Sequence, residues 1–339
     1  MNGLLQHLAT IGLVVMLALP GTAQRRSASP DRDADPPAGD VGAASASHRE
    51  LKPLDIPFGA ITALHLHPDG DLLATDGQAR QIKIISPAGK QVGSIELDFA
   101  PEALDVSADG TLFCGGQGRL AKLTKNGRVL KIVDVPGATD SQVDETTRRR
   151  ARDRPTRISG IAATDRHVFV AFGSGWSLGS KSRLFRFDLD WENAKLLAEG
   201  LRGCCQRCDL AAHNGVLYLA ENAAHRVVAY DRDGTILNKW GTQSRLALEG
   251  FGSCCNPMNL CFDGEGVLYT AESGLGRVKR YTSDGRFLGL VGYIGVERFS
   301  LAGDLAASCS NIAIAVTPDG GRVYVMDFKN NQVRILEKN

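Results

Sequence analysis

The stretch LAAHNGVLYLAENAAHRVVAYDRDGTILNKWG, residues 210–241, decides the fold. It contains four short, largely apolar segments, LAAH, VLYLAE, RVVAY and TILNKW, separated by turns. The Asp-Gly pair before the last segment favours a tight hairpin between antiparallel strands. These features predict a four-stranded antiparallel unit with a length of about 40 residues.

The same unit recurs along the chain. Its first segment carries an apolar anchor in each copy, at steps of 40 to 57 residues: Leu64, Leu104, Ile161, Leu210, Leu260 and Ile314. Six four-stranded repeats of this kind are typical of a β-propeller. The 38 glycines among 339 residues fit a turn-rich, all-β chain. We therefore predict an all-β fold, a six-bladed β-propeller with four-stranded blades.

The two ends of the repeat region indicate how the ring closes. The sixth unit stops after its third strand because the chain ends at Asn339. Residues 50–57 (ELKPLDIP) precede the first unit and have no other strand to pair with. We expect this N-terminal segment to pair into the last blade, so that residues 49–339 form one propeller domain without open sheet edges.

The N-terminal region predicts export. Leu8–Leu19 is an apolar run followed by Pro20 and small residues, which is typical of a signal peptide over residues 1–23. Residues 24–48 are rich in Ser, Ala, Asp and Pro, and predict a disordered linker. We expect a periplasmic or extracellular protein, with a membrane attachment only if the signal segment stays uncleaved. The near-cancelling charge, 39 Lys and Arg against 38 Asp and Glu, gives no basis for nucleic-acid binding.

Three segments carry a resemblance to a known family. They are ENAAHRVVAYDRDG (221–234), ESGLGRVKRYTSDG (272–285) and DFKNNQVRILE (327–337). Each has an acid, a short loop, Arg or Gln and an apolar strand, and the first two end in Asp-Gly. In this pattern the chain resembles the NHL-repeat propellers. The resemblance implies a six-bladed propeller, but the family's functions range from protein-binding scaffold to lyase, so it does not define the chemistry.

Seven of the eight cysteines fall between residues 204 and 309, and five of these follow the repeat. Three of them stand five residues before the anchors of units 4 to 6, in connections that should open on one face beside the channel. We therefore predict a cysteine cluster on the channel rim, formed by Cys204, Cys205, Cys208, Cys254, Cys255, Cys261 and Cys309. Such a cluster could bind a metal, as zinc, copper or an iron–sulfur cluster, or could form the disulfides expected of an exported protein. The eighth, Cys114, is expected to be a buried thiol.

Other residues are candidates for binding a cofactor or a partner. Trp176 lies in a loop that could reach the same rim, and arginine-rich residues 136–157 could join it in recognising a protein or small molecule on that face. Four acids recur in the repeat: Asp76, Glu221, Glu272 and Asp327. They could line a pocket, or they could instead bond to loop NH groups and to Arg226 or Arg277. We retain Glu221 and Glu272 as candidate cofactor-binding residues.

Two further resemblances concern enzymes. The lyase branch of the NHL family uses histidines for zinc, and His65 and His67 here share one face of a strand. Lactonase-type propellers also resemble this fold and hold calcium with carboxylate and Asn side chains at the channel. The residues that could imitate that set are Asn256, Asn259, Asn311 and Glu272.

Three functions remain open. The chain could be a binding or electron-transfer module that works through its cysteine rim. It could be a non-enzymatic, partner-binding scaffold with structural disulfides. It could also be a calcium-dependent, lactonase-like hydrolase, although the sequence shows no standard catalytic motif in a suitable context.

Overall fold

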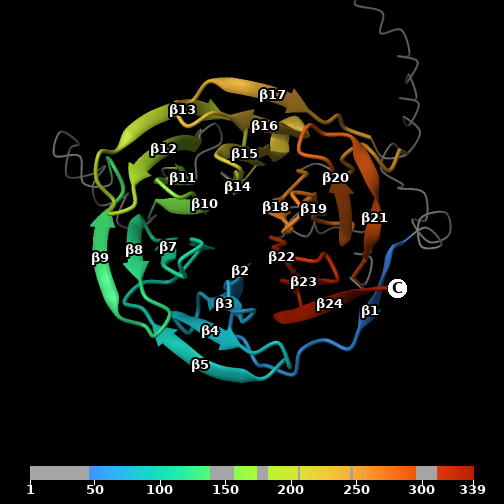
Figure 1. Cartoon of the computed structure of the whole chain (residues 1–339), viewed down its shortest axis with the longest axis horizontal. Helices are drawn as coiled ribbons and strands as arrows, with labels where there is room; N and C mark the ends of the chain where they lie inside the picture. The colour runs from blue at the N-terminus through green and yellow to red at the C-terminus, as the bar shows by residue number, and fades with distance from the viewer. Residues whose placement is uncertain are drawn as a thin grey trace, which may run out of the picture. The chain divides into compact units, whose positions relative to one another are not determined.

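A computed structural model describes residues 46–137, 156–173, 182–204, 207–244, 247–253, 255–294 and 311–339. These residues belong to one unit that begins at Pro37, whereas the predicted signal peptide and most of the predicted linker lie outside the described residues. The described strands form six antiparallel sheets of four strands each, arranged as blades around a central axis (Figure 1). The predicted six-bladed propeller is confirmed.

The first three blades follow the chain order from the axis outward. Blade 1 contains β2 (Ile61–Leu66), β3 (Leu72–Asp76), β4 (Gln81–Ile85) and β5 (Gln91–Glu96). Blade 2 contains β6 (Ala103–Val106), β7 (Leu112–Gly116), β8 (Arg119–Leu123) and β9 (Val129–Asp134). Blade 3 contains β10 (Arg157–Ala163), β11 (His167–Gly173), β12 (Ser182–Asp188) and β13 (Lys195–Leu201).

The remaining blades complete the ring. Blade 4 contains β14 (Leu210–His213), β15 (Val216–Glu221), β16 (Arg226–Tyr230) and β17 (Ile236–Trp240), with a 3-10 turn, η3 (Asn222–Ala224). Blade 5 contains β18 (Asn259–Phe262), β19 (Leu268–Glu272), β20 (Arg277–Tyr281) and β21 (Phe287–Tyr293). Blade 6 contains β22 (Ile314–Val316), β23 (Arg322–Asp327), β24 (Gln332–Lys338) and, from the other end of the chain, β1 (His48–Leu51).

The N-terminal strand closes the ring, as predicted, but in a shifted position. β1 pairs antiparallel with β24, from His48 opposite Lys338 to Leu51 opposite Ile335. The strand predicted at residues 50–57 therefore begins and ends earlier in the chain than expected. The strand ends at Leu51 because Pro53 follows shortly after it and has no NH to donate to a ladder.

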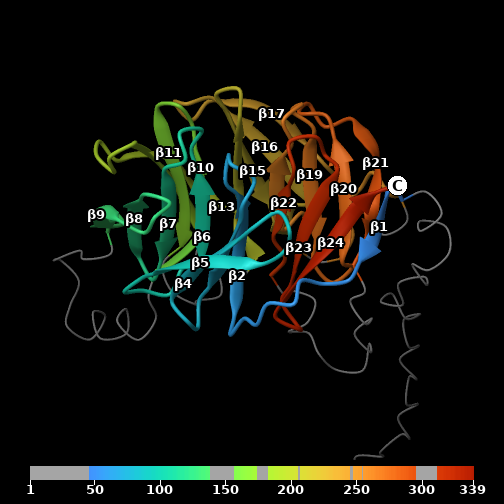
Figure 2. The ribbon, with the colours of Figure 1, turned by 60° about the horizontal axis from the view of Figure 1, so that its bottom comes forward.

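Apolar packing holds neighbouring blades together. The buried residues fall into six clusters, and each cluster combines side chains from two adjacent blades. The second strands are the most deeply buried, since all five residues of β3, β7 and β19 are inaccessible. Figure 2 shows the blades packed face to face around the axis. The core is thus divided among the blade interfaces, and the axis itself stays open for a site.

A belt of polar contacts joins the inner strands. At every junction between blades, a side chain on one inner strand, or just before it, bonds to the backbone of the next. The six bonds are Thr62 Oγ1 to Pro101 O (2.7 Å), Glu102 Oε2 to Ile158 N (2.8 Å), Ser159 Oγ to Cys208 O (3.0 Å), Asp209 Oδ2 to Leu260 N (2.8 Å), Asn259 Oδ1 to Ile314 N (2.8 Å) and Asn311 Nδ2 to Thr62 O (2.9 Å). This belt fixes the positions of the side chains that face the axis.

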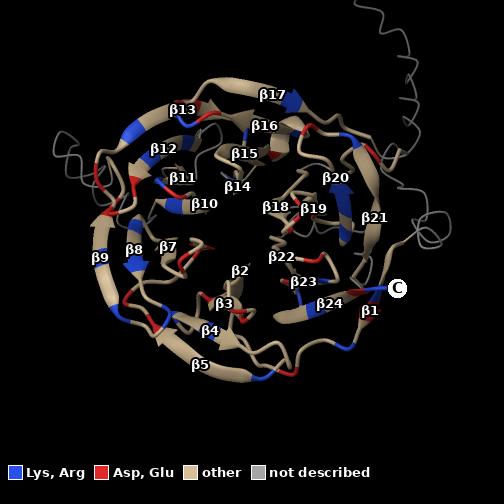
Figure 3. Ribbon diagram, in the orientation of Figure 1, with Lys and Arg blue, Asp and Glu red and all other residues tan. Residues whose placement is uncertain are grey.

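Both acidic and basic residues occur in every blade (Figure 3). No helix in the described part of the chain has the length and apolar character needed to cross a membrane.

Candidate active site

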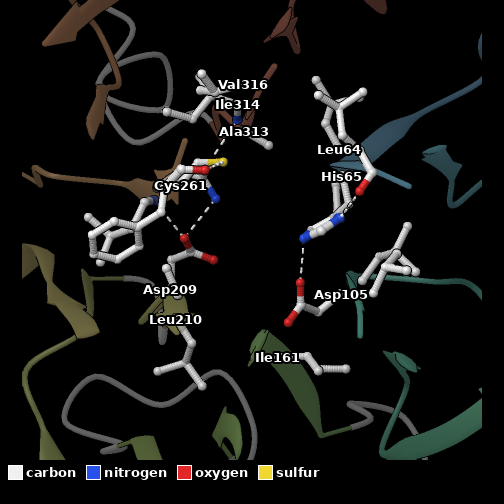
Figure 4. Close-up of a pocket in the computed structure, with 18 of the residues that line it drawn as sticks. Leu64, His65, Asp105, Ile161, Asp209, Leu210, Cys261, Ala313, Ile314 and Val316 are labelled. Carbon is white, nitrogen blue, oxygen red and sulfur yellow. Dashed lines mark hydrogen bonds and ion pairs between the residues drawn. The ribbon is translucent and has the colours of Figure 1, made fainter. Parts of the chain in front are cut away.

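The inner strands of all six blades surround a central cavity of about 550 Å³. This volume lies in the range of small-molecule sites, about 300 to 1,000 Å³. The wall includes all six repeat anchors that the sequence identified: Leu64, Leu104, Ile161, Leu210, Leu260 and Ile314. Figure 4 shows several of these apolar side chains around the cavity, with a small number of titratable groups between them. Polar and apolar side chains line the cavity in similar measure, and a cavity with apolar walls and convergent polar groups is typical of a ligand site.

The first polar group is an ion pair between two blades. His65 on β2 bonds through Nε2 to Oδ1 of Asp105 on β6, and its Nδ1 lies 2.8 Å from the Leu66 carbonyl oxygen. Because both ring nitrogens face acceptors, both must carry a proton, so His65 is an imidazolium. Burial alone would lower the pKa of His65, but the charge and hydrogen bond of Asp105 outweigh it and raise the pKa. The two side chains keep 30% and 15% of their accessible area, so the pair can contact a bound molecule.

The neighbouring blade holds this ion pair in place. Asp105 Oδ2 accepts a hydrogen bond of 2.5 Å from the Ala163 NH on β10. Both oxygens of Asp105 are therefore engaged, one by His65 and one by the backbone of blade 3. This arrangement fixes the carboxylate and, through it, the orientation of the imidazolium.

The second polar group is a carboxylic acid, Asp209, which immediately precedes β14. Its Oδ2 accepts two hydrogen bonds of 2.8 Å, from Asn259 Nδ2 and from the Leu260 NH. Burial raises the pKa of Asp209 to about 8, even though the backbone hydrogen bonds oppose this change. Asp209 therefore keeps its proton at neutral pH and can donate it.

Asn259 determines which oxygen of Asp209 carries that proton. The Asn259 Oδ1 accepts a hydrogen bond from the Ile314 NH, which fixes the amide so that Nδ2 points to Asp209. Since Oδ2 of Asp209 already accepts two bonds, the proton resides on Oδ1. Asn259 is thus a positioning residue for the acid.

These groups face one another across the axis. Figure 4 shows His65 and Asp105 on one side of the cavity and Asp209 with Cys261 on the other. This follows from the topology, because blades 1 and 2 lie opposite blades 4 and 5 in a ring of six. A charged pair and a protonated acid on opposite walls of one cavity are equipped for acid–base chemistry on a molecule held between them.

The described cysteines do not converge on one point. Cys204 and Cys208 lie in the connection from β13 to β14, Cys255 precedes β18, and Cys261 lies on β18 at the cavity wall. Cys255 belongs to the apolar cluster between blades 5 and 6, and Cys204 and Cys261 pack against it. Cys208 belongs to the cluster between blades 3 and 4. Cys205, Cys254 and Cys309 lie outside the described residues.

The thiol chemistry of these cysteines also differs from that of the predicted metal site. No two of the described cysteines are joined by a disulfide, and no three His, Cys, Asp or Glu side chains among the described residues are close enough to share a metal ion. Burial raises the pKa of Cys208 and of Cys261 to about 12, so both are protonated thiols at neutral pH. Cys114 is buried, as expected from the sequence.

The repeated acids lie within the blades, away from the cavity. Glu221 accepts hydrogen bonds from the Arg202 NH (3.1 Å) and from Arg226 Nε (2.5 Å). Glu272 is fully buried between Arg277 Nη2 (2.5 Å) and Lys279 Nζ (2.6 Å). Neither Glu221 nor Glu272 lines the central cavity, and their contacts match the structural alternative stated for them. Trp176 lies outside the described residues.

The residues proposed for a calcium site do not fit one. Asn256 is buried in a loop, where it bonds to Gly252 O and to both backbone groups of Ser273. Glu272 is engaged by two cations, and the amides of Asn259 and Asn311 carry contacts between blades. These side chains lie apart from one another and are already satisfied, so they do not form a set of calcium ligands.

The histidines also do not form a zinc site. His67 follows β2 and bonds to Asp69, whereas His213 stacks on Phe262 with 4.7 Å between ring centroids. His65 is the one that joins the polar group at the axis. Asp105 and Asp209 were not identified from the sequence, although each stands next to a repeat anchor, Leu104 or Leu210, which is the signal that could have identified them.

Comparison with known proteins supports the fold. No protein-family model matches the chain, and no curated protein matches its sequence. A gluconolactonase from Xanthomonas campestris is 14% identical with a TM-score of 0.58, over 87% of this chain and 91% of that one. Regucalcin from Agrobacterium tumefaciens, a calcium-binding protein, is 14% identical with a TM-score of 0.56, over 86% and 93%. Virginiamycin B lyase from Staphylococcus aureus is 13% identical with a TM-score of 0.52, over 87% and 89%.

At this level of identity the likeness establishes the architecture alone. The six-bladed fold implied by the NHL resemblance is confirmed, and membership of that family remains a prediction. The solved structures that share the fold include enzymes that act on small molecules, as their names state.

Proposed function

We propose that the chain is an enzyme that acts on a small polar molecule in its central channel by acid–base chemistry, with the opening of a cyclic ester as the reaction class. The carrying observation is that the His65–Asp105 ion pair and the protonated Asp209 face each other across a cavity of about 550 Å³. The shared fold with a gluconolactonase supports the choice of reaction.

The geometry assigns a role to each group. Water adds to the ester carbonyl carbon, and its proton passes to the carboxylate of Asp105, because the imidazolium of His65 already carries a proton on each ring nitrogen. The bond between that carbon and the ring oxygen then breaks, and Asp209 gives the proton on Oδ1 to the departing oxygen. Asp209 regains a proton from the pair through water in the channel, which restores the starting state. Asn259 keeps the Asp209 proton on the channel side throughout.

A screen of small lactones tests this proposal. Acid release is followed for wild type, Asp209→Asn and the exposed outer-strand control Leu196→Thr, each with and without added divalent cations. General acid catalysis contributes about 10² to 10⁴ in rate, so Asp209→Asn should lose at least about 100-fold while the control keeps wild-type turnover. Wild-type turnover should fall above pH 8 as Asp209 ionises. Turnover that survives in Asp209→Asn would contradict the assigned acid.

The cysteine-bearing connections remain a second candidate, because Cys204, Cys255 and Cys261 contact the same apolar cluster between blades 5 and 6. Sulfur ligands of this kind select zinc, copper or an iron–sulfur cluster, and a metal or redox site here would require these thiols to lose their protons and to approach one another. Metal analysis of the purified chain and of Cys255→Ser tests it. Stoichiometric metal that is lost in the variant is the supporting result, and a metal content unaffected by the substitution excludes these ligands.

A further inference from the structure

The charges in the central cavity are balanced by one another. The imidazolium of His65 is neutralised by Asp105, and Asp209 keeps its proton. The other cation at the wall, Arg207, lies near the carboxyl group of Glu102, which senses its charge. A further acidic side chain, Asp263, accepts the NH groups of its own turn. The cavity therefore offers no surplus positive charge to an anion.

An anion would enter this cavity at a large cost. A carboxylate that leaves water without a counter-charge loses several kcal/mol of solvation. An uncharged molecule does not pay this cost, and its polar atoms can still bond to Asp105 and Asp209. The electrostatics of the channel thus select against negative charge in the ligand.

The arrangement of polar and apolar walls adds a restriction on shape. The titratable groups at the middle of the channel come from two opposite sides, blades 1 and 2 and blades 4 and 5. Between them, the walls from blades 3 and 6 carry mainly apolar side chains, because the polar ones, Ser159 and Asn311, are bonded to backbone groups. They are formed by Ile161, Ala163, Ala313, Ile314 and Val316. A molecule that fills this space meets apolar side chains on two faces and polar groups on two edges.

We propose that the channel binds a flat ring molecule without negative charge that presents a hydrogen-bond acceptor to Asp209 at one edge and a donor to Asp105 at the opposite edge. This inference rests on the same site as the proposed function and specifies its ligand. It also accounts for product release, because the hydroxy acid formed by opening a cyclic ester is an anion that the channel disfavours.

A matched pair of probes tests the inference without any reaction. 4-(Hydroxymethyl)benzamide and 4-(hydroxymethyl)benzoate share a ring and an alcohol donor that stays neutral from pH 7 to 9, and at these pH values they differ in charge. Calorimetric titration of the intact chain at pH 7 should show the amide binding at least about tenfold more tightly, which corresponds to about 1.4 kcal/mol. Equal binding, or tighter binding of the benzoate, would overturn the inference, and so would no binding of either probe.

Two further measurements place the binding in the channel. Ile314→Ala removes part of an apolar wall and should weaken both probes by a similar factor. Raising the pH from 7 to 9 ionises Asp209, so amide binding to wild type should weaken at least about threefold, whereas binding to Asp209→Asn should stay constant. Amide binding to wild type that does not change with pH would contradict the role given to Asp209. If the amide binds as expected but no lactone is turned over, the ligand class stands and the proposed reaction fails.

Discussion

Replacing Glu272 by Gln removes the anion that lies between two buried cations. Its partners Arg277 and Lys279 have side-chain exposures of 7% and 0%, so neither can turn to water for compensation. Lys279 Nζ also donates to Gly250 O at 2.6 Å, and this bond holds the connection from β17 to β18 against blade 5. Removal of one partner from a buried pair costs about 3 to 5 kcal/mol, and we expect Glu272→Gln to lose this amount of unfolding free energy.

The repeat provides a matched control for this prediction. Glu221 occupies the same position in blade 4, but its partner Arg226 is 34% exposed and can be hydrated when the anion is removed. Glu221→Gln should therefore lose only about 1 kcal/mol. Urea denaturation at pH 7 measures both changes, and the slope of unfolding free energy against urea should be unchanged. Equal losses in the two variants would refute the argument that the burial of the cations sets the cost.

Three further predictions concern titration and the closure of the ring. The pKa of Asp209 is raised from 3.8 to about 8, so the wild type should lose stability as the pH rises between these values, at up to about 1.4 kcal/mol per pH unit. In urea denaturation, Asp209→Asn should then be about 2 to 4 kcal/mol more stable than wild type at pH 7 and no more stable than wild type at pH 3.5. Parallel plots of unfolding free energy against pH for the two proteins would contradict this prediction. Burial lowers the pKa of His48, whose ring bonds to Gly320 O at 2.9 Å. The wild type should therefore lose stability below pH 6.5 relative to His48→Gln. A melting temperature that depends on acid pH in the same way for both proteins would contradict this prediction. Asn311→Ala removes the bond to Thr62 O that links blades 6 and 1, and should lower the unfolding free energy in urea denaturation by about 1 kcal/mol. An unchanged unfolding free energy would contradict a role for the belt of polar contacts in stability.

The architecture could be predicted because it is encoded locally and repeatedly. The anchors such as Leu210 mark the inner strand of every blade, and the Asp-Gly pairs mark hairpins whose glycines adopt positive φ, 94° at Gly234. The missing fourth strand of the last unit correctly indicated that the N-terminus closes the ring. The register of that strand could not be predicted, because it depends on pairing with β24 at the opposite end of the chain.

The central site could not be predicted from the same signals. Glu221 and Glu272 repeat because they make the same local contacts in their blades, with a loop or its arginine, and not because they face a common site. His65, Asp105 and Asp209 do not repeat, and they meet only because the ring places blades 1 and 2 opposite blades 4 and 5. The raised pKa of Asp209 arises from burial in the assembled channel, which no local pattern encodes.

A measurement of the ionisation of Asp209 shows whether the channel holds a proton donor at neutral pH. The carboxyl carbon of Asp209 can be followed by NMR from pH 3 to 10 in the intact wild-type chain, with Asp209→Asn identifying the signal. The account predicts a carboxylic acid that keeps its proton through pH 7 and ionises with a midpoint near 8. A midpoint near the ordinary value of 3.8 would show a carboxylate at neutral pH, with no proton to give to a bound molecule.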